Sequence, residues 1–280
     1  MTGLADLPPL REVLAAEGLL ARKSFGQHFL LDLNVTRKIA RLAAPLAGSV
    51  VIEVGPGPGG LTRALLESDA AHVIAVEKDP RFLPLLHDLA AAAPGRLTLI
   101  EADALTVDET ALIAAHAPGL VPRVISNLPY NVGTTLLIKW LTGPLRPVAM
   151  HLMFQKEVAL RIAAPVGSDA YGRLSVIAQA VAETRIAMTL PARAFTPPPK
   201  VDSAVAELVL RTQDRPSAAR LAALETVTAH AFGQRRKMLR SSLKALGGAA
   251  LCEAAGIDAD ARAETIPVDG FLALAKVVEA

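Results

Sequence analysis

The chain has 280 residues, of which 52% are hydrophobic and 4% aromatic, and its formal net charge is +2. This length suffices for one large domain, or for a large domain with a small appendage. Such a small net charge does not by itself indicate a nucleic-acid partner, so the distribution of the basic residues has to decide. Cys252 is the only cysteine, which excludes an intramolecular disulfide and a cysteine-based zinc cluster.

The N-terminal residues carry charges, among them Asp6, Arg11 and Glu12, where a secretory signal peptide needs an apolar core. No apolar run of the sequence approaches the length that spans a bilayer. We therefore expect a cytoplasmic protein with no membrane attachment, and the sequence offers no motif for a metal ion.

The elements predicted from apolar periodicity alternate between strands and helices. A short amphipathic helix over 9–21 leads to the basic pair Arg22-Lys23, a loop over 26–30 and a helix over 34–44. Strands are predicted over 50–54, 73–76, 97–100, 121–126 and 148–154, and helices over 61–68, 80–93 and 134–141. Residues 174–190 and 204–210 are predicted to complete the sheet. This alternation is typical of a doubly wound α/β sheet, which binds its ligand at the carboxyl ends of the strands.

Two breaks in the pattern divide the rest of the chain. The segment 194–201 contains three successive prolines, which cannot lie inside a helix or a central strand, so we expect a stiff extended loop. The pattern breaks again at 213–216, and residues 217–280 are predicted to be helical. We therefore predict a large α/β domain over 1–212 and a small all-α domain over 213–280.

A glycine-rich loop follows the first predicted strand. Gly55, Gly57 and Gly60 match the dinucleotide pattern G-x-G-x-x-G, and Glu77 closes the second strand, where a carboxylate can accept both hydroxyls of a ribose. NAD and S-adenosylmethionine both carry such a ribose. The loop prolines at 56 and 58 lack the N–H groups that a pyrophosphate needs, so the loop favours S-adenosylmethionine, which has no phosphate.

Two further carboxylates lie near predicted strand ends. Glu53 is surrounded in its strand by apolar residues, where a charge is costly unless it is paired. Its carboxylate either bonds amides of the glycine loop or reaches solvent, and the sequence favours neither. Asp103 closes the third strand, where it either caps the following segment or accepts the adenine amine of the cofactor. With Glu77 already in place, we favour the cofactor for Asp103.

Asn127-Leu128-Pro129-Tyr130 follows the fourth predicted strand, on the same rim as the glycine loop. The exocyclic amine of adenine is a poor nucleophile because its lone pair is delocalised into the ring. The Asn127 side-chain oxygen and the Leu128 carbonyl can each accept one N–H of that amine and so aim its lone pair at a methyl donor. Pro129 holds Leu128 extended, and Tyr130 offers a face on which a base can stack. An isolated tetrapeptide of this kind would be an ordinary turn; its position on this rim favours catalysis.

Taken together, these residues resemble the ribosomal RNA adenine N6,N6-dimethyltransferase family, and its small-subunit branch in particular. The resemblance covers nearly the whole chain and is carried by Lys23–Leu30, Glu53–Gly57, Val76–Asp79, Asp103-Ala104, Asn127–Tyr130, Phe195–Val201 and Phe232–Lys237. It implies a Rossmann-like class I methyltransferase sheet with a small all-α C-terminal domain, and S-adenosylmethionine as the cofactor.

The resemblance also implies roles for individual residues. The cofactor site would be lined by His28, Leu30, Gly55, Gly57, Glu77, Asp103 and Asn127. Phe195 would hold the flipped adenine opposite Tyr130. His28 stands where many relatives have asparagine, and an imidazole can still donate and accept a hydrogen bond there.

The family's substrate is a pair of adjacent adenosines in a hairpin loop near the 3′ end of small-subunit (16S) rRNA, each of which receives two methyl groups. Bases of single-stranded loops can be splayed out and stacked on aromatic side chains. The resemblance therefore implies that the partner is small-subunit rRNA within an assembling 30S subunit, and we expect the enzyme to act as a monomer.

Residues 229–246 are predicted to form one basic helix. Its apolar stripe consists of Phe232, Leu239, Leu243 and Leu246, and beside it lie the basic residues Arg235, Arg236, Lys237, Arg240 and Lys244. Because the overall charge is nearly balanced, this local concentration favours contact of Arg236 and Arg240 with an rRNA backbone over a merely solvated face.

Three alternatives remain open at this point. The chain could methylate another amine, in large-subunit rRNA, DNA or a protein glutamine, although the 195–201 loop and the basic helix argue against this. It could be a non-catalytic ribosome-assembly or RNA-binding factor, but such a protein would not need Glu77, Asp103, Asn127 and Tyr130. An NAD-dependent enzyme fits least well.

Overall fold

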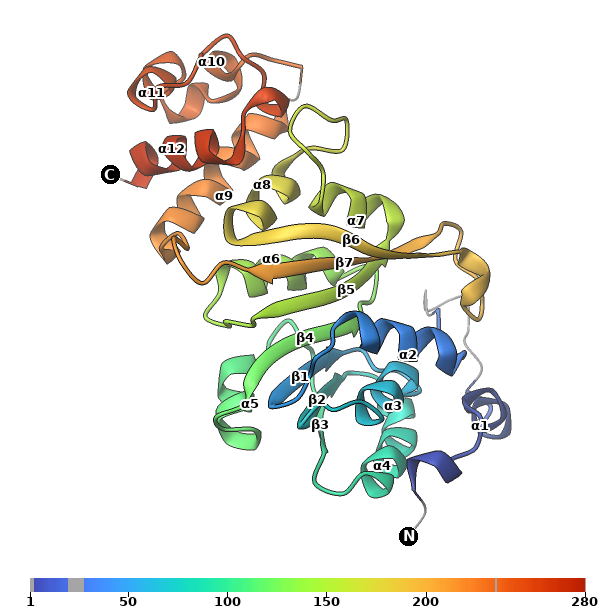
Figure 1. The fold of residues 1–280 in the computed structure, drawn as a ribbon. Helices are drawn as coiled ribbons and strands as arrows, with labels where there is room; N and C mark the ends of the chain where they lie inside the picture. The colour runs from blue at the N-terminus through green and yellow to red at the C-terminus, as the bar shows by residue number, and fades with distance from the viewer. Residues whose placement is uncertain (1–2, 20–27, 235, 280) are drawn as a thin grey trace.

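The computed structural model describes residues 3–19, 28–234 and 236–279 (Figure 1). The predicted features Arg22-Lys23 and Gly26-Gln27, and the basic residue Arg235, lie outside these residues. At the centre is a seven-stranded sheet with the strand order β3-β2-β1-β4-β5-β7-β6. The strands are β1 (Ser49–Val54), β2 (His72–Glu77), β3 (Leu97–Glu101), β4 (Val121–Asn127), β5 (Ala149–Gln155), β6 (Ala182–Leu190) and β7 (Ser203–Leu210).

Strands β1 to β5 are parallel, whereas β7 runs antiparallel to both β5 and β6. The described helices are α1 (Leu10–Ala16), α2 (Leu33–Leu42), α3 (Gly60–Leu66), α4 (Leu83–Ala92), α5 (Glu109–His116), α6 (Gly133–Thr142), α7 (Lys156–Ile162), α8 (Arg173–Val181), α9 (Ala218–Gly233), α10 (Leu239–Ser242), α11 (Ala249–Ala254) and α12 (Val268–Glu279). The doubly wound α/β sheet predicted from the alternating pattern is therefore confirmed.

Successive side chains of β1 point to opposite faces of the sheet, as the period of a strand requires. Val51 faces the cluster built with α2, α3 and α4, whereas Ile52 and Val54 face the cluster built with α6, α7 and α8. Because both faces of β1 are covered, all six of its residues are buried. This explains why the sequence shows a continuous apolar run there instead of an alternation.

The carboxyl ends of the central strands meet at one edge of the sheet. The backbone N–H of Gly55 donates to the Val76 carbonyl at 2.9 Å, and that of Ala102 donates to the Glu77 carbonyl at 3.1 Å. The parallel register of β1 with β4 brings Asn127 to the same edge. This rim therefore gathers side chains from four separate parts of the chain.

The C-terminal helices α9 to α12 lie at one end of the sheet (Figure 1) and share a hydrophobic core with α6 and α8. Leu224 and Phe271 belong to the same buried cluster as Trp140 and Val176. The Tyr171 hydroxyl donates to the Ile266 carbonyl at 3.0 Å. These contacts fix the helical part of the chain relative to the sheet.

Two sequence-based predictions are wrong. Residues 174–190 do not form sheet throughout, because α8 occupies 173–181 before β6 begins at Ala182. Most residues of α8 are buried, and a buried apolar run has no periodicity that separates a helix from a strand. The prediction also passed over α5 and α7.

The single basic helix predicted over 229–246 is the second wrong prediction. Helix α9 ends at Gly233, and Met238 pairs instead as an isolated antiparallel bridge with Arg262. The N–H of Leu239 then donates to the Ala261 carbonyl at 2.9 Å. Leu239 and Leu243 are nevertheless fully buried, so the apolar positions were identified although the helix that carries them is interrupted.

Candidate active site

The glycine loop between β1 and α3 depends on left-handed backbone conformations at Gly55 and Gly57, whose φ angles are +68° and +54°. A Cβ atom at Gly55 would lie 3.2 Å from the Pro129 ring, and one at Gly57 would lie 3.3 Å from the Phe29 ring. Glycine therefore lets the loop turn sharply and approach the Asn127–Tyr130 segment closely.

Glu77 holds this loop in place. One of its carboxylate oxygens accepts the N–H of Gly57 at 2.9 Å, and the other accepts those of Lys78 and Asp79 at 2.9 and 2.8 Å. Burial raises the pKa of Glu77, and the three N–H groups counteract this effect. The oxygen that accepts only the Gly57 N–H retains a further lone pair with which it can accept a ligand hydroxyl.

Two cavities of about 130 and 150 Å³ lie along the rim. Gly55, Glu77 and Pro129 line both of them, so Glu77 stands between the two compartments. The first compartment is also lined by His28, Leu30, Glu53, Gly57 and Asn127. The second is also lined by Lys78, Asp103 and Val132. Six of the seven residues predicted to bind the cofactor thus line the first compartment. The seventh, Asp103, lines the second.

Glu53 is buried, with 2% of its surface exposed, and does not reach solvent. Its Oε2 atom has no hydrogen-bond partner among the described residues. Burial raises the pKa of Glu53 to about 8, because the nearby Thr62 offsets only part of the desolvation. A buried carboxyl oxygen without a hydrogen-bond partner on a cavity wall is suited to a cationic ligand group, which would supply the missing interaction.

Asn127 ends β4 on the wall of the first compartment. Its side chain makes no hydrogen bond with another described residue. The following Leu128 side chain is buried against Gly133, and the Leu128 N–H donates to the Met153 carbonyl at 3.3 Å. No described residue donates to the Leu128 carbonyl, so two acceptors at this point are available to a ligand.

His28 lines the first compartment on the side of the proline-rich loop, and the Tyr130 ring lies next to the His28 ring. The Tyr130 hydroxyl lies 2.8 Å from the Ser203 hydroxyl. The centroids of the Tyr130 and His28 rings are 5.8 Å apart. His28 Nδ1 lies 2.7 Å from the Pro197 carbonyl. Because a carbonyl only accepts, Nδ1 carries the proton and Nε2 is left for another partner.

Asp103 lies at the far end of the second compartment. One carboxylate oxygen accepts the Leu105 N–H at 3.0 Å, and the other is paired with the Lys78 ammonium at 2.8 Å. This pairing lowers the pKa of Asp103, and the Lys78 side chain is 74% exposed. Asp103 thus caps the following turn, one of the two roles predicted from the sequence, while its other oxygen is paired with an exposed ammonium that a ligand amine could displace.

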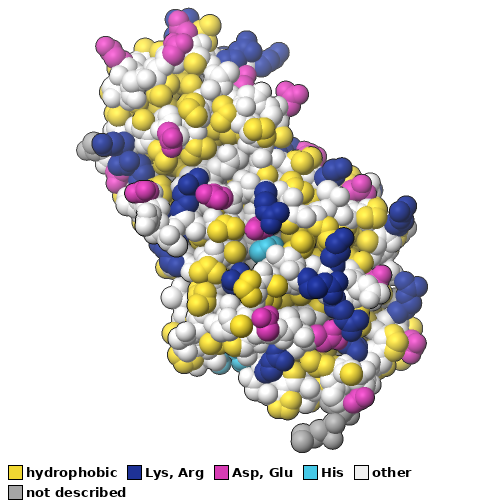
Figure 2. Space-filling view, viewed as in Figure 1, with side chains coloured by type: hydrophobic (Ala, Val, Ile, Leu, Met, Phe, Trp, Pro, Cys, Tyr) yellow, Lys and Arg dark blue, Asp and Glu magenta, His cyan; other side chains and the backbone are white. Residues whose placement is uncertain are grey.

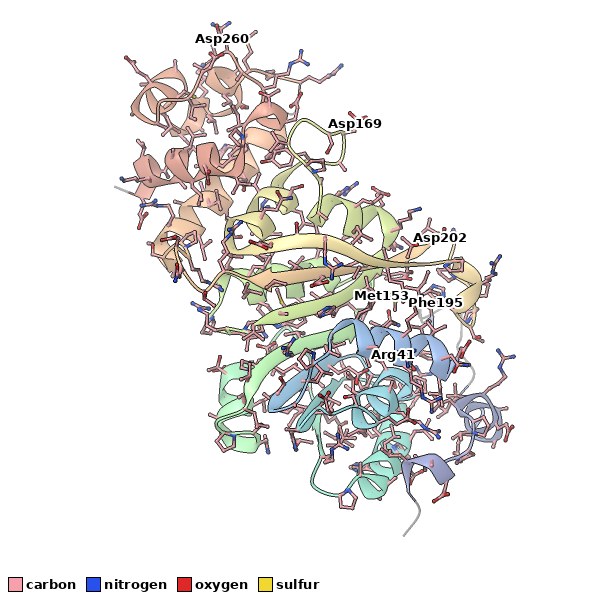
Figure 3. All side chains as sticks on the ribbon, in the orientation of Figure 1. Arg41, Met153, Asp169, Phe195, Asp202 and Asp260 are labelled. Atoms are coloured by element: carbon pink, nitrogen blue, oxygen red, sulfur yellow. The ribbon has the colours of Figure 1, made fainter. Side chains whose placement is uncertain are left out.

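Phe195 lies in the core and not on a wall of either cavity. Its side chain is 3% exposed and belongs to the same buried cluster as Met153, which lies beside it in Figure 3. The role at the flipped base stays a prediction, and it would require Phe195 to leave this packing. The neighbouring backbone is at the site, because Thr196 exchanges two hydrogen bonds with Phe29, at 2.9 and 3.0 Å.

The predicted RNA-binding residues are far along the chain from this rim. Arg236 is exposed, and Arg240 in α10 forms an exposed ion pair with Asp260 at 3.0 Å; Asp260 marks the tip of the C-terminal helices in Figure 3. Over the described ranges, no cluster of His, Cys, Asp and Glu could hold a metal ion. None of the helices in the described part of the chain could span a bilayer.

The strand order with its antiparallel β7, the glycine loop and the acidic strand ends together define a Rossmann-like class I methyltransferase. The predicted fold class is confirmed. Enzymes of this class use S-adenosylmethionine, and the residues present fit it: a buried carboxyl without a partner, a glycine cradle and a carboxylate between two compartments.

Comparisons with known proteins identify the family. The model of the family described as ribosomal RNA adenine dimethylase matches residues 18–280, so the chain belongs to this family and is a methyltransferase. The ribosomal RNA small subunit methyltransferase A of Phenylobacterium zucineum is 68% identical over 97% of this chain and 93% of its own length. The protein of the same description from Caulobacter vibrioides is 68% identical over 92% of this chain and 97% of its own length.

Solved structures agree with this assignment at the level of the fold. A dimethyladenosine transferase from Plasmodium falciparum superposes with a TM-score of 0.72 at 23% identity, covering 88% of this chain and 96% of its own. The 23S rRNA methyltransferase ErmE superposes with a TM-score of 0.66 at 25% identity, covering 90% of this chain and 100% of its own.

Proposed function

We propose that this enzyme transfers methyl groups to the N6 amines of two adjacent adenosines in the 3′-terminal hairpin loop of small-subunit rRNA, two methyl groups to each, during assembly of the 30S subunit. The relatives named as small-subunit methyltransferases support the choice of subunit, since they match this chain over nearly its full length. This function places the enzyme where ribosomes assemble, in the cytoplasm, and we propose that it acts there as a monomer.

We assign the first compartment to the methionine part of the cofactor and the second to its adenine. Glu53 and Asn127 line the first, where the cofactor carries its two positive charges, and Asp103 lines the second. Glu77 lines both compartments and would accept a ribose hydroxyl between them. When bound, S-adenosylmethionine supplies an electrophilic methyl group on a sulfonium.

The observation that carries the proposed reaction is the pair of acceptors on Asn127 and Leu128 to which no described residue donates. Two acceptors match the two N–H bonds of an adenine amine, and their position fixes its lone pair toward the cavity. No strong base is needed before transfer, because the amine can lose its proton after the methyl group has arrived. Such positioning of two reactants can contribute about 7–11 kcal/mol to lowering a barrier.

The target base would stack on the ring of Tyr130, whose hydroxyl forms a hydrogen bond with the Ser203 hydroxyl. Base–aromatic stacking is worth about 1–3 kcal/mol, which offsets part of the cost of extruding the base from its loop. We propose that Arg236 and Arg240 contact the rRNA backbone, with residues 213–280 as a helical RNA-binding domain beside the catalytic domain 1–212. In that complex the Arg240–Asp260 pair would have to share its guanidinium with phosphate.

Methyl transfer from labelled S-adenosylmethionine to ribosomal subunits that lack the modification tests this proposal. Label is expected in two adjacent adenosines of small-subunit rRNA, up to four methyl groups per particle. Large subunits serve as the control. Label in large-subunit rRNA and none in small subunits would overturn the proposed substrate and favour the specificity named for ErmE.

A further inference from the structure

A third and larger cavity lies next to the two cofactor compartments. It has a volume of about 700 Å³ and opens between α1, α2 and the end of β6 with the turn that follows. Volumes of this size are typical of sites that bind a ligand. We call this cavity the basic groove, after Arg11, Lys38 and Arg193 on its rim.

The three basic side chains of the groove have no acidic partners among the residues that the structure describes. All three residues are exposed, and none forms an ion pair with another described residue. The acidic residue of the described lining, Asp32, is engaged as the N-cap of α2 and accepts the Asn34 N–H at 2.8 Å. Three cations against one acid give the described lining of the groove a net charge of +2, as much as the whole chain carries.

The neighbouring Arg37 shows that unpaired cations are not the rule on this helix. It forms two hydrogen bonds with Glu67, at 2.6 and 3.0 Å, on the side of α2 that faces α3. Lys38, the next residue of the helix, lines the groove instead. Figure 2 shows Lys and Arg side chains gathered over α2 on this face.

The floor of the groove is apolar. Val35 and Met188 are half-buried there, and Leu190 is buried. An apolar floor beneath a cationic rim is the combination that binds single-stranded nucleic acid, because bases and sugars pack on the floor while phosphates meet the cations. An acidic peptide would use the rim alone and leave the floor without a complementary surface.

One pair of backbone segments separates the groove from the cofactor site. Thr196 lines the groove, Phe29 lines the first cofactor compartment, and the two residues exchange both of their backbone hydrogen bonds. A strand that delivers a base to Asn127 and Tyr130 past His28 would therefore leave the site at the mouth of the groove.

We propose that the basic groove binds the phosphodiester backbone of the RNA strand that flanks the target adenosine. The inference rests on the proposed function, since it gives the substrate a path away from the catalytic rim. The groove belongs to the catalytic part of the chain and lies apart from Arg236 and Arg240, so it is a second and separate contact with the RNA.

The test measures RNA binding as a function of salt. Lys38→Ala, Arg193→Ala and the double variant are compared with the wild type, using unmethylated small subunits and a labelled single-stranded oligoribonucleotide. Each lost phosphate contact is expected to reduce the slope of log K against log salt by about 0.7, and the double variant by about 1.4. The KM for small subunits is expected to rise with little change in kcat.

Arg211→Ala is the matched control. Arg211 is exposed, forms no ion pair with a described residue, and follows β7 at the end of the sheet opposite the rim. Its slope and KM are expected to equal those of the wild type. Cofactor affinity measured by calorimetry is expected to stay unchanged in all variants, which shows that each one is folded.

Equal salt slopes in the wild type and the double variant would overturn the inference. A reduction of the slope in Arg211→Ala as large as that in the groove variants would also overturn it. A weaker affinity for RNA with an unchanged slope would also overturn it, since a backbone contact must release counterions. The proposed function is judged separately, by where the wild type places its label. If that label appeared in large-subunit rRNA only, the slopes on the oligoribonucleotide would still decide whether the groove binds RNA.

Discussion

His28 Nδ1 lies 2.7 Å from the carbonyl oxygen of Pro197, a residue 169 positions away in the chain. The bond connects the segment that lines the cofactor compartment with the proline-rich loop beside Tyr130. Because the imidazole donates from Nδ1, its geometry couples the wall of the cofactor site to the loop that borders the proposed base site.

This hydrogen bond predicts that two substitutions of His28 have different effects on activity. An asparagine can donate an N–H from a similar position, so His28→Asn is expected to keep kcat and cofactor affinity within about threefold of the wild type. His28→Ala loses a hydrogen bond worth about 0.5–1.5 kcal/mol and is expected to lower kcat/KM by about two- to twelvefold. Steady-state kinetics on small subunits measure both, and equal activity of the two variants would refute the coupling.

Ser203 is expected to position Tyr130. Its side chain is fully buried, and its hydroxyl lies 2.8 Å from the Tyr130 hydroxyl. Ser203→Ala and Tyr130→Phe each remove this one bond, so each is expected to lower kcat by about two- to twelvefold. The double variant is expected to lose no more than either single one. Additive losses would show that the two hydroxyls act independently.

Asn127→Ala is expected to abolish methyl transfer while only partly weakening cofactor binding. The variant removes one of two acceptors for the target amine, and loss of one positioned transition-state hydrogen bond commonly costs about 10²–10³ in kcat. Single-turnover transfer measures the chemical step, and calorimetry measures cofactor affinity. Full transfer by this variant would remove the catalytic role assigned to Asn127.

Glu53 is expected to make the stability of the free protein depend on pH. The pKa of its carboxyl is about 8 in the folded protein and 4.5 in an unperturbed chain. Below the lower value both states hold the proton, and its contribution to stability is fully present. Between the two values only the folded state keeps the proton, so this contribution falls as pH rises through about 8.

Glu53→Gln removes this dependence because the amide stays neutral. One pKa unit corresponds to about 1.4 kcal/mol, so the variant is expected to gain several kcal/mol relative to the wild type between about pH 5 and pH 8.5. Urea unfolding at both pH values, without cofactor, measures the difference. A gap that does not change with pH would show that Glu53 is ionised in the folded protein.

Much of the fold followed from local patterns. The five parallel strands were predicted to within one or two residues of their ends, because buried strands give short apolar runs that glycines and prolines delimit. The rim residues Gly55, Glu77, Asp103 and Asn127 could be placed together because parallel strands end on the same edge. Such inferences need only the pattern of apolar residues along the chain and the direction of its strands.

Other features required contacts between distant segments. The break after Gly233 comes from the pairing of Met238 with Arg262, which no local propensity encodes. The burial of Phe195 depends on the packing around Met153, and the partner of His28 comes from the other half of the chain.

The sequence by itself thus determined the kind of sheet, the rim and the chemistry of the side chains placed there. Only the tertiary structure decided which of those side chains are already engaged. It fastens Glu77 to three N–H groups, while it leaves Glu53 Oε2 and the Leu128 carbonyl without partners among the described residues. The physical reason is that residue type fixes what a group can donate or accept, whereas packing fixes what lies within reach of it.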